Sequence, residues 1–299
     1  MKYDIVIAGG RGDPSILSLI AASRTMGLSV RFIVHDAEHE PDFRWEPLTG
    51  KMDVDGEELS ANGLFIRFDV FNQALAAPTD SATGARDRAL AWYTAVSSWG
   101  LVAGVRTFNA GLTQAAALKP LALIFAARRG LAIPKTVISN RRQDTKSQDG
   151  PLIVKPVGGG AYTVLAADLE GSTEWRDHLA PAPALIQEKL SYPEYRVYLV
   201  GERMLAFETY ATNLDFRLDR DARTRFMGPD ELDPGLTERL RGLARDMSLD
   251  FCAFDLKTRP ATREVCFLEV NSSPMFSAFD VQADGELNRA ILDHLSKRT

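Results

Sequence analysis

Cysteine and histidine are scarce in this sequence, which limits the chemistry that its side chains can support. The 299 residues include two cysteines and four histidines. Cys252 and Cys266 occupy apolar positions, where we expect small buried hydrophobic side chains rather than a disulfide or a metal pair. The histidines have neither triad nor metal-ligand spacing, and we expect them at the surface: His35, His39, His178 and His294.

Long apolar runs and an excess of positive charge are also missing. No apolar run approaches the roughly 20 residues of a membrane span. The net charge of −5 disfavours nucleic acid and anionic membranes as partners. Met1-Lys-Tyr-Asp leads directly into a predicted strand rather than a signal peptide, so we expect a cytoplasmic protein. The length suits two or three lobes rather than one core.

The common nucleotide-binding loops are absent. There is no G-x-x-x-x-G-K-[ST], which excludes the common P-loop. Residues 3–8 and 28–34 predict strands around a helix that starts at Asp13-Pro14, and therefore a parallel sheet. The intervening Gly9-Gly10-Arg11-Gly12 differs from G-x-G-x-x-G, so we expect a tight turn rather than a dinucleotide site.

Hydrophobic periodicity and the positions of glycine and proline predict further helices, strands and loops. We expect surface loops at 36–62 and 73–88, a strand at 64–68 and a helix at 89–104. A second helix contains Lys119-Pro120 and stops at Gly130. In the second half, strands are predicted at 151–157, 184–190, 197–200 and 203–209, and helices at 230–247 and 288–295.

Residues 251–274 predict a hairpin that carries acidic and amide side chains. Glu269 and Asn271 are two apart on one strand and share a face. If Lys257 pairs with Val265, Asp255 lies on that same face, diagonal to Glu269. Two carboxylates this close repel unless a cation lies between them, and oxygen ligands alone suit magnesium. The alternative is an ordinary hairpin with two solvated acids.

A glycine-rich segment lies between two predicted strands. Lys155 lies near the end of the predicted strand 151–157, and three glycines at 158–160 precede the next strand. Such a loop is costly to order, and its backbone amides could wrap phosphate oxygens beside the lysine. The alternative is a simple hairpin turn.

The order of these features carries more information than any one of them. In sequence come Lys119, Lys155, the glycine loop, Glu188 and Glu194, an arginine pair and the D…E-x-N hairpin. This order resembles the ATP-grasp superfamily over essentially the full chain.

Two subfamilies are suggested by local sequence. Leu268-Glu-Val-Asn-Ser-Ser-Pro274 looks most like the ribosomal-protein glutamate ligases. Asn109…Lys119…Gly130-Leu-x-Ile-Pro-x-Thr136…Asn140 and Leu214-Asp-Phe-Arg217 look like the ATP-grasp maturases that crosslink ribosomal peptides. Those maturases usually continue E-x-N with a Gly-Gln-Trp-like run, whereas this chain has Ser272-Ser-Pro-Met-Phe.

The resemblance implies an α/β architecture in three parts. These are an N-terminal Rossmann-like parallel-sheet domain (1–106), a central lobe (107–187) and a C-terminal lobe (188–299), with ATP clamped between the last two. The N-terminal domain and the loop 211–220 would hold the substrate.

The resemblance also implies roles for individual residues. Lys119, Lys155 and the loop Gly158, Gly159 and Gly160 would contact the ATP phosphates. Gln187, Glu188, Lys189 and Leu190 would meet the adenine, and Glu194 the ribose. Asp255, Glu269 and Asn271 would hold one or two Mg²⁺ ions, with Mn²⁺ as an alternative. Lys155 and one of Arg196 and Arg217 would act on the reacting groups.

The implied chemistry is ligation. A carboxylate would attack the γ-phosphate of ATP to give an acyl phosphate, and an amine, less often a hydroxyl, would displace phosphate. We expect an ATP-dependent carboxylate–amine ligase acting on a peptide, a protein or an amino acid. One alternative is a macrocyclase that crosslinks a ribosomal precursor peptide by ester or amide bonds, and another is a non-catalytic ATP-binding regulatory module. A homodimer is possible, and neither nucleic acid nor membrane is an expected partner.

Overall fold

The computed structural model describes the chain except for residues 1, 37–39, 72–80, 112–117, 148, 159–161, 172–174, 177, 215–218 and 298–299, and except for the side chains of 81–83. The chain divides into two compact units. The first contains residues 1–110 and 275–299, and the second contains residues 111–274. Among the described residues, no helix is long and apolar enough to span a bilayer.

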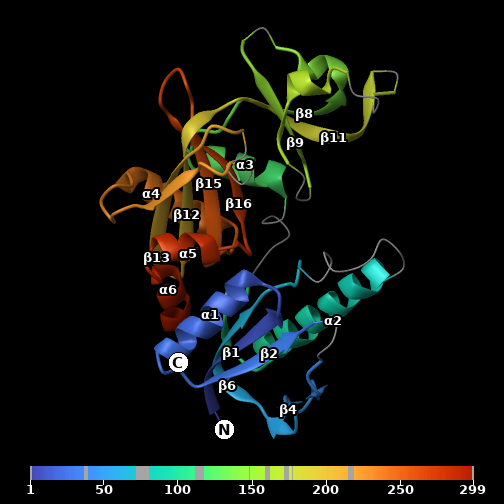
Figure 1. Cartoon of the computed structure of the whole chain (residues 1–299), viewed down its shortest axis with the longest axis vertical. Coiled ribbons are helices and arrows are strands. Elements are labelled where there is room, and N and C mark those ends of the chain that lie inside the picture. Colours follow the sequence, from blue (N-terminus) through green and yellow to red (C-terminus); the bar gives the residue numbers. More distant parts are fainter. Residues whose placement is uncertain are drawn as a thin grey trace. The chain divides into compact units, whose positions relative to one another are not determined.

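The first unit is built on a parallel sheet with the strand order β2-β1-β6-β7. Its strands are β1 (Lys2–Gly10), β2 (Val30–His35), β6 (Ser60–Ile66) and β7 (Arg106–Thr107). Its helices are α1 (Pro14–Thr25), α2 (Ser81–Val102), α5 (Ser277–Gln282) and α6 (Glu286–Ser296) (Figure 1). A small antiparallel sheet is formed by β3 (Phe43–Trp45), β4 (Met52–Val54) and β5 (Glu57–Glu58). The predicted strand–helix–strand start is confirmed.

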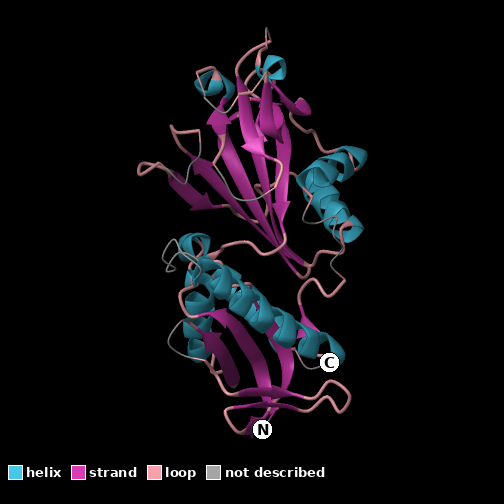
Figure 2. Cartoon of the chain, turned by 90° about the vertical axis from the view of Figure 1, so that its right-hand side faces the viewer, coloured by secondary structure: helices cyan, strands magenta, loops and turns pink. Residues whose placement is uncertain are grey.

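The second unit contains two antiparallel sheets (Figure 2). The central sheet has the order β10-β9-β11-β8, with β8 (Thr136–Arg141), β9 (Leu152–Pro156), β10 (Val164–Leu165) and β11 (Leu179–Glu188). The five-stranded sheet has the order β14-β13-β12-β15-β16, with β12 (Ser191–Val200), β13 (Arg203–Tyr210), β14 (Arg223–Phe226), β15 (Phe251–Thr258) and β16 (Val265–Asn271). The helices are α3 (Lys119–Arg128) and α4 (Pro234–Asp246), and the 3₁₀ turns are η3 (Arg142–Thr145) and η4 (Ala166–Leu169).

The five-stranded sheet has one apolar face. Its other face, called the polar face, carries charged side chains beside the buried Phe207. Its apolar face packs on α3 and α4, whose contributions to this core include Leu123, Leu240 and Leu243. Helix α4 is set by local sequence, because Asp233 caps it by accepting from the Leu236 amide and Pro234 opens it. The opposite face of the sheet is therefore the one available for chemistry.

Several predicted elements differ from the structure. The stretch 36–62 contains β3, β4, β5 and the start of β6, where Met52 and Val54 are buried although each strand is too short to show a clear pattern. Residues 81–88 belong to α2 rather than to a loop. His35 is 4% exposed and stacks on Trp92, so its surface placement was wrong.

The two units divide the chain differently from the three predicted parts. The predicted boundary between residues 187 and 188 falls within the second unit, where β11 ends and the chain passes to β12. Residues 275–299 group with the first unit instead of the C-terminal lobe. Helix α6 explains this grouping, since a side chain at Gly63 of β6 would lie 2.3 Å from the Leu295 carbonyl oxygen.

Candidate active site

A row of charged side chains crosses the polar face of the five-stranded sheet. Arg196 on β12 pairs with Asp255 on β15, and Asp255 pairs with Glu269 on β16. Antiparallel partners share a face, so the three side chains emerge together. The sequence prediction that Asp255 and Glu269 lie close is confirmed by this register.

The pairing of the hairpin differs in detail from the prediction. Lys257 pairs with Cys266, and an irregularity follows, because Leu256 pairs with Phe267 while Asp255 pairs with Glu269. Leu268 is the extra residue of a β-bulge. It allows Phe267 to enter the apolar core while Glu269, two residues on, takes the polar face. Asp255 and Glu269 are therefore directly opposite rather than diagonal.

Hydrogen bonds hold the Asp255 carboxylate from two sides. Arg196 Nη1 donates to Asp255 Oδ1 at 2.8 Å, and Asn271 Nδ2 donates to Asp255 Oδ2 at 3.0 Å. Arg196 Nε donates to the Tyr198 hydroxyl at 2.9 Å. The structure thus brings together Arg196, Asp255, Glu269 and Asn271 as predicted, and it adds Tyr198, which the sequence analysis had not singled out.

Burial shapes the charge of the two carboxyl groups. Burial raises the pKa of Asp255 to about 7, Arg196 opposes this rise, and the neighbouring Glu269 adds to it. Burial acts in the same direction on Glu269, but Lys155 and Lys119 outweigh it and lower the Glu269 pKa. A pair of carboxylates that resists full ionisation is the arrangement expected where a cation belongs.

Two lysines, on α3 and β9, interact electrostatically with the carboxylate of Glu269. Lys119, the first residue of α3, places its Nζ 3.3 Å from Glu269 Oε2. Lys155 on β9 is 8% exposed, and burial lowers its pKa, while Glu269, the first attractive neighbour, opposes that change. A buried ammonium group of this kind gains from an anionic ligand.

The end of β11 offers a buried polar acceptor. Gln187 is fully buried, and its Nε2 donates to Thr136 Oγ1 at 2.8 Å. Its Oε1 has no hydrogen-bond partner among the described residues. An orphaned buried amide oxygen is costly, and the exocyclic amine of an adenine would satisfy it. This residue therefore fits the predicted nucleotide site.

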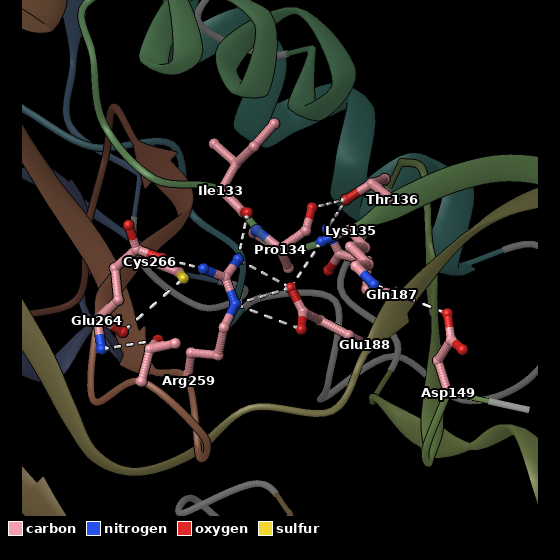
Figure 3. A network of polar contacts seen from close by, with 11 residues as sticks. Ile133, Pro134, Lys135, Thr136, Asp149, Gln187, Glu188, Arg259, Glu264 and Cys266 are labelled. Carbon is pink, nitrogen blue, oxygen red and sulfur yellow. Dashed lines mark hydrogen bonds and ion pairs between the residues drawn. The ribbon is translucent and has the colours of Figure 1, made fainter. Parts of the chain in front are cut away.

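The neighbouring Glu188 carboxylate is already engaged by the protein. Its Oε1 accepts from the Lys135 amide at 2.8 Å and from Arg259 Nη2 at 2.9 Å (Figure 3). Arg259 Nη2 also donates to the Ile133 carbonyl oxygen at 3.0 Å. The side chain of Glu188 is thus used within this network.

A lysine lies beside the residue predicted to bind ribose. Lys257 Nζ is 3.2 Å from Glu194 Oε2 and 4.0 Å from the centroid of the Tyr192 ring. A cavity of about 370 Å³ adjoins it, lined also by Lys189 and Leu190. Lys257 was not among the predicted site residues, although its position two residues after Asp255 on a strand predicts the same face.

Of the remaining predicted residues, Gly158 is described, and it is exposed. Gly159, Gly160 and Arg217 lie outside the described residues. Within the part of the chain that is described, no cluster of three or more His, Cys, Asp or Glu side chains suits a metal.

Comparison with known proteins identifies the fold of this chain. No protein-family model matches the chain, and no curated protein does. The structure of the ATP-grasp ligase PsnB, complexed with a phosphomimetic variant of a minimal precursor, Mg and ADP, matches with a TM-score of 0.77. The match has 23% identity and covers 99% of both chains. The chain has the ATP-grasp fold.

Two further structures share the ATP-grasp fold with this chain. The macrocyclase MdnC from Microcystis aeruginosa MRC, bound with the precursor peptide MdnA, matches with a TM-score of 0.73 and 19% identity over 99% of this chain and 100% of that chain. The D-Ala:D-Ser ligase VanG from Enterococcus faecalis matches with a TM-score of 0.57 and 14% identity over 98% of each chain. The predicted ATP-grasp fold is therefore confirmed.

Proposed function

We propose that this chain is an ATP-dependent ligase that activates a carboxylate as an acyl phosphate and transfers the acyl group to an amine. The observation that carries the proposal is the grouping of three cationic side chains around two facing carboxylates and an amide in the second unit: Lys119, Lys155, Arg196, Asp255, Glu269 and Asn271. The ATP-grasp fold supports this reading, since PsnB of the same fold is complexed with Mg and ADP.

In this proposal, Asp255, Glu269 and Asn271 hold one or two magnesium ions. Magnesium sites commonly use one or two carboxylates and take their remaining ligands from water and substrate phosphates. The facing pair of Asp255 and Glu269 fits that pattern, and manganese could use the same oxygen ligands. When bound, the metal neutralises charge on the transferring phosphoryl group.

The protein's own cations would bind the anionic reactants. Lys119 and Lys155 would contact the phosphates, together with backbone amides of the loop at 158–160. Gln187 and the backbone of residues 188–190 would hold the adenine, with Glu194 on the ribose. Arg196 or Arg217 would bind the planar oxyanion through two parallel hydrogen bonds.

The reaction then needs alignment more than covalent catalysis. A carboxylate oxygen attacks the γ-phosphorus and ADP leaves, after which the amine nitrogen attacks the acyl carbon and phosphate leaves with transfer of the amine proton. One preorganised donor is typically worth about 3–4 kcal/mol, and alignment can contribute roughly 7–11 kcal/mol. No nucleophilic Ser, Cys or His is required. We place this activity in the cytoplasm, where Mg-ATP is abundant.

A peptide is the substrate class that the comparisons favour. PsnB and MdnC are both seen with precursor peptides, and both match more closely than VanG. The second candidate function is therefore crosslinking of a precursor peptide by ester or amide bonds. In either case we assign substrate binding to the N-terminal domain and the loop 211–220.

The decisive experiment measures ADP and phosphate release with candidate carboxylate and amine substrates. A ligase of this mechanism forms ADP when the carboxylate is present, and it should release ADP and phosphate in continuous turnover when the amine is present as well. A protein that binds Mg-ATP but releases no ADP with any peptide or amino acid tested would support a regulatory module instead. Mass spectrometry of a co-expressed precursor would distinguish loss of water, which indicates a crosslink, from addition of a residue.

A further inference from the structure

The chain passes between the two sheets of the second unit at two places, which we call the crossing segments. One is residues 131–135, between α3 and β8, and the other is residues 188–190, which run from the last residue of β11 to the start of β12. Any motion of one sheet relative to the other must bend these segments. The contacts that hold the crossing segments therefore determine the position of the residues at the end of β11 that we propose bind the nucleotide.

The first crossing segment is attached to the five-stranded sheet. The Phe267 amide donates to the Ala132 carbonyl oxygen at 2.8 Å, and Ala132 forms a parallel bridge with Cys266 of β16. The hairpin tip is closed in turn by the Arg259 amide, which donates to the Glu264 carbonyl oxygen at 2.8 Å, and by an ion pair between their side chains. The backbone of Arg259 is therefore held in place beside this crossing segment.

Glu188 and Arg259 join the two crossing segments to each other. The Glu188 amide donates to the Lys135 carbonyl oxygen at 3.1 Å, and the Lys135 amide returns a bond of 2.8 Å to the Glu188 carboxylate. Arg259 donates to that carboxylate through Nη2 at 2.9 Å and through Nε at 3.2 Å, and Nη2 reaches Ile133 of the first segment (Figure 3). One guanidinium thus touches both segments at once.

This contact is more than an ordinary surface ion pair. The side chains of Arg259 and Glu188 are 22% and 21% exposed. Burial alone would raise the pKa of Glu188, but the bonds from Arg259 and the Lys135 amide lower it. A planar, multiply bonded arginine also loses less entropy per bond than a lysine would.

Glu188, which Arg259 holds in place, is adjacent to Gln187 at the end of β11. Side chains alternate along a strand, so Glu188 faces Arg259 while Gln187 faces Thr136. Fixing Glu188 fixes the end of β11 and with it the side chain of Gln187, whose Oε1 has no hydrogen-bond partner within the described part of the chain.

We propose that Arg259 and Glu188 form a positioning pair, which holds the crossing segments in the geometry that binds the nucleotide base. This inference rests on the proposed function, and it gives the Glu188 carboxylate a role in positioning rather than in direct contact with adenine. The sequence alone does not point to Arg259, because its partners Glu188 and Ile133 are 71 and 126 residues away.

The test compares Arg259→Gln with wild type by two measurements. Hydrogen exchange at the Lys135 and Glu188 amides should become at least about tenfold faster, because their segments are no longer joined. Affinity for Mg-ADP, measured by calorimetry on the folded full chain, should weaken by about tenfold. Arg259→Lys keeps the charge but not the planar fork, so its affinity should lie between the two.

The matched control is Arg225→Gln. Arg225 also bonds two glutamates, Glu208 and Glu231, on the same unit, and its loss should change neither measurement. A purely structural role for Arg259 would lower the melting temperature and leave the Mg-ADP affinity of the folded protein unchanged, which would overturn the inference. If Arg259→Gln does not fold, Glu188→Gln takes its place, and wild-type affinity in that variant would equally refute it.

The two proposals fail in different ways. A wild-type protein that does not bind Mg-ADP refutes the proposed function, and with it any role of the pair in nucleotide binding. Wild-type binding with unchanged affinity and exchange in Arg259→Gln refutes only the positioning pair.

Discussion

Glu269 and Asp255 face each other across β15 and β16, and their charges should matter more for chemistry than for folding. We expect Glu269→Gln to lower turnover by at least about hundredfold, the cost of losing a metal ligand and its charge. The melting temperature should change little, because the side chain lies on the polar face of the sheet and not in its core. Glu202→Gln, at a fully exposed turn, is the control. Full activity in Glu269→Gln would remove Glu269 from the metal site.

The raised pKa of Asp255 predicts how nucleotide binding depends on pH. A metal requires the ionised carboxylate, and with a pKa of about 7 the ionised fraction falls by about tenfold between pH 8 and pH 6. Affinity for Mg-ADP should fall by a similar factor over this range, as calorimetry can show. The free energy of unfolding of the metal-free protein should instead increase as pH falls. A pKa raised by folding contributes stability that is complete below the unfolded value near 4 and is lost as pH rises through 7. Mg-ADP affinity that stays constant from pH 8 to pH 6 would contradict this prediction.

Residues could be predicted where a short spacing placed them on one face. Glu269 and Asn271 fall in that class, because the alternation of one strand groups them. Asp255 needed a hairpin register as well, which was predicted only approximately. Arg259 could not be predicted, because its role arises from contacts with Glu188 and Ile133, which are distant in sequence. The assigned roles of Lys119, Gln187 and Glu194 came from the resemblance, and they stay predictions until a nucleotide complex tests them.

At the scale of elements, the polar face of the five-stranded sheet depends on the helices packed behind it. Leu240 of α4 is fully buried in the core shared with β12, β15 and β16. Leu240→Ala should lower the free energy of unfolding by about 2–5 kcal/mol, as expected for a cavity in a packed core. Denaturant unfolding checks this value. Arg245→Ala on the exposed face of the same helix removes one ion pair and should cost less than about 1 kcal/mol. Equal effects of the two changes would mean that α4 is not anchored as described.

Element prediction succeeded where periodicity was long and failed where elements were short. Helix α4 was visible from its leucine stripe, although it begins at Pro234 and not at residue 230 as predicted. Strands β3, β4 and β5 have three residues or fewer, too few for an alternating pattern, so their region was predicted as loop. The bulge at Leu268 was also missed, because only the pairing with β15 reveals an extra residue.

At the scale of the whole molecule, the order of motifs predicted the ATP-grasp fold, but not how the chain ends. Residues 275–299 return to the first unit, where α6 packs close to Gly63 of β6. The sequence of α6 shows an amphipathic helix and does not specify which sheet its apolar side covers. A long-range packing choice of this kind needs the three-dimensional structure.

The division into two units predicts where a nucleotide should stabilise the chain. Lys119, Lys155, Asp255 and Glu269 all belong to residues 111–274, so Mg-ADP should slow hydrogen exchange there, most strongly in β9, β15 and β16. At a concentration of 100 times the dissociation constant, the bound unit should gain about 2.7 kcal/mol. The first unit, 1–110 with 275–299, contributes no predicted nucleotide ligand and should exchange as in the free protein. Asp255→Asn with Mg-ADP is the control, once circular dichroism shows that the variant is folded, because it loses a proposed metal ligand. Protection confined to the first unit would place the nucleotide outside the polar face of the five-stranded sheet and overturn the assignment of the active site.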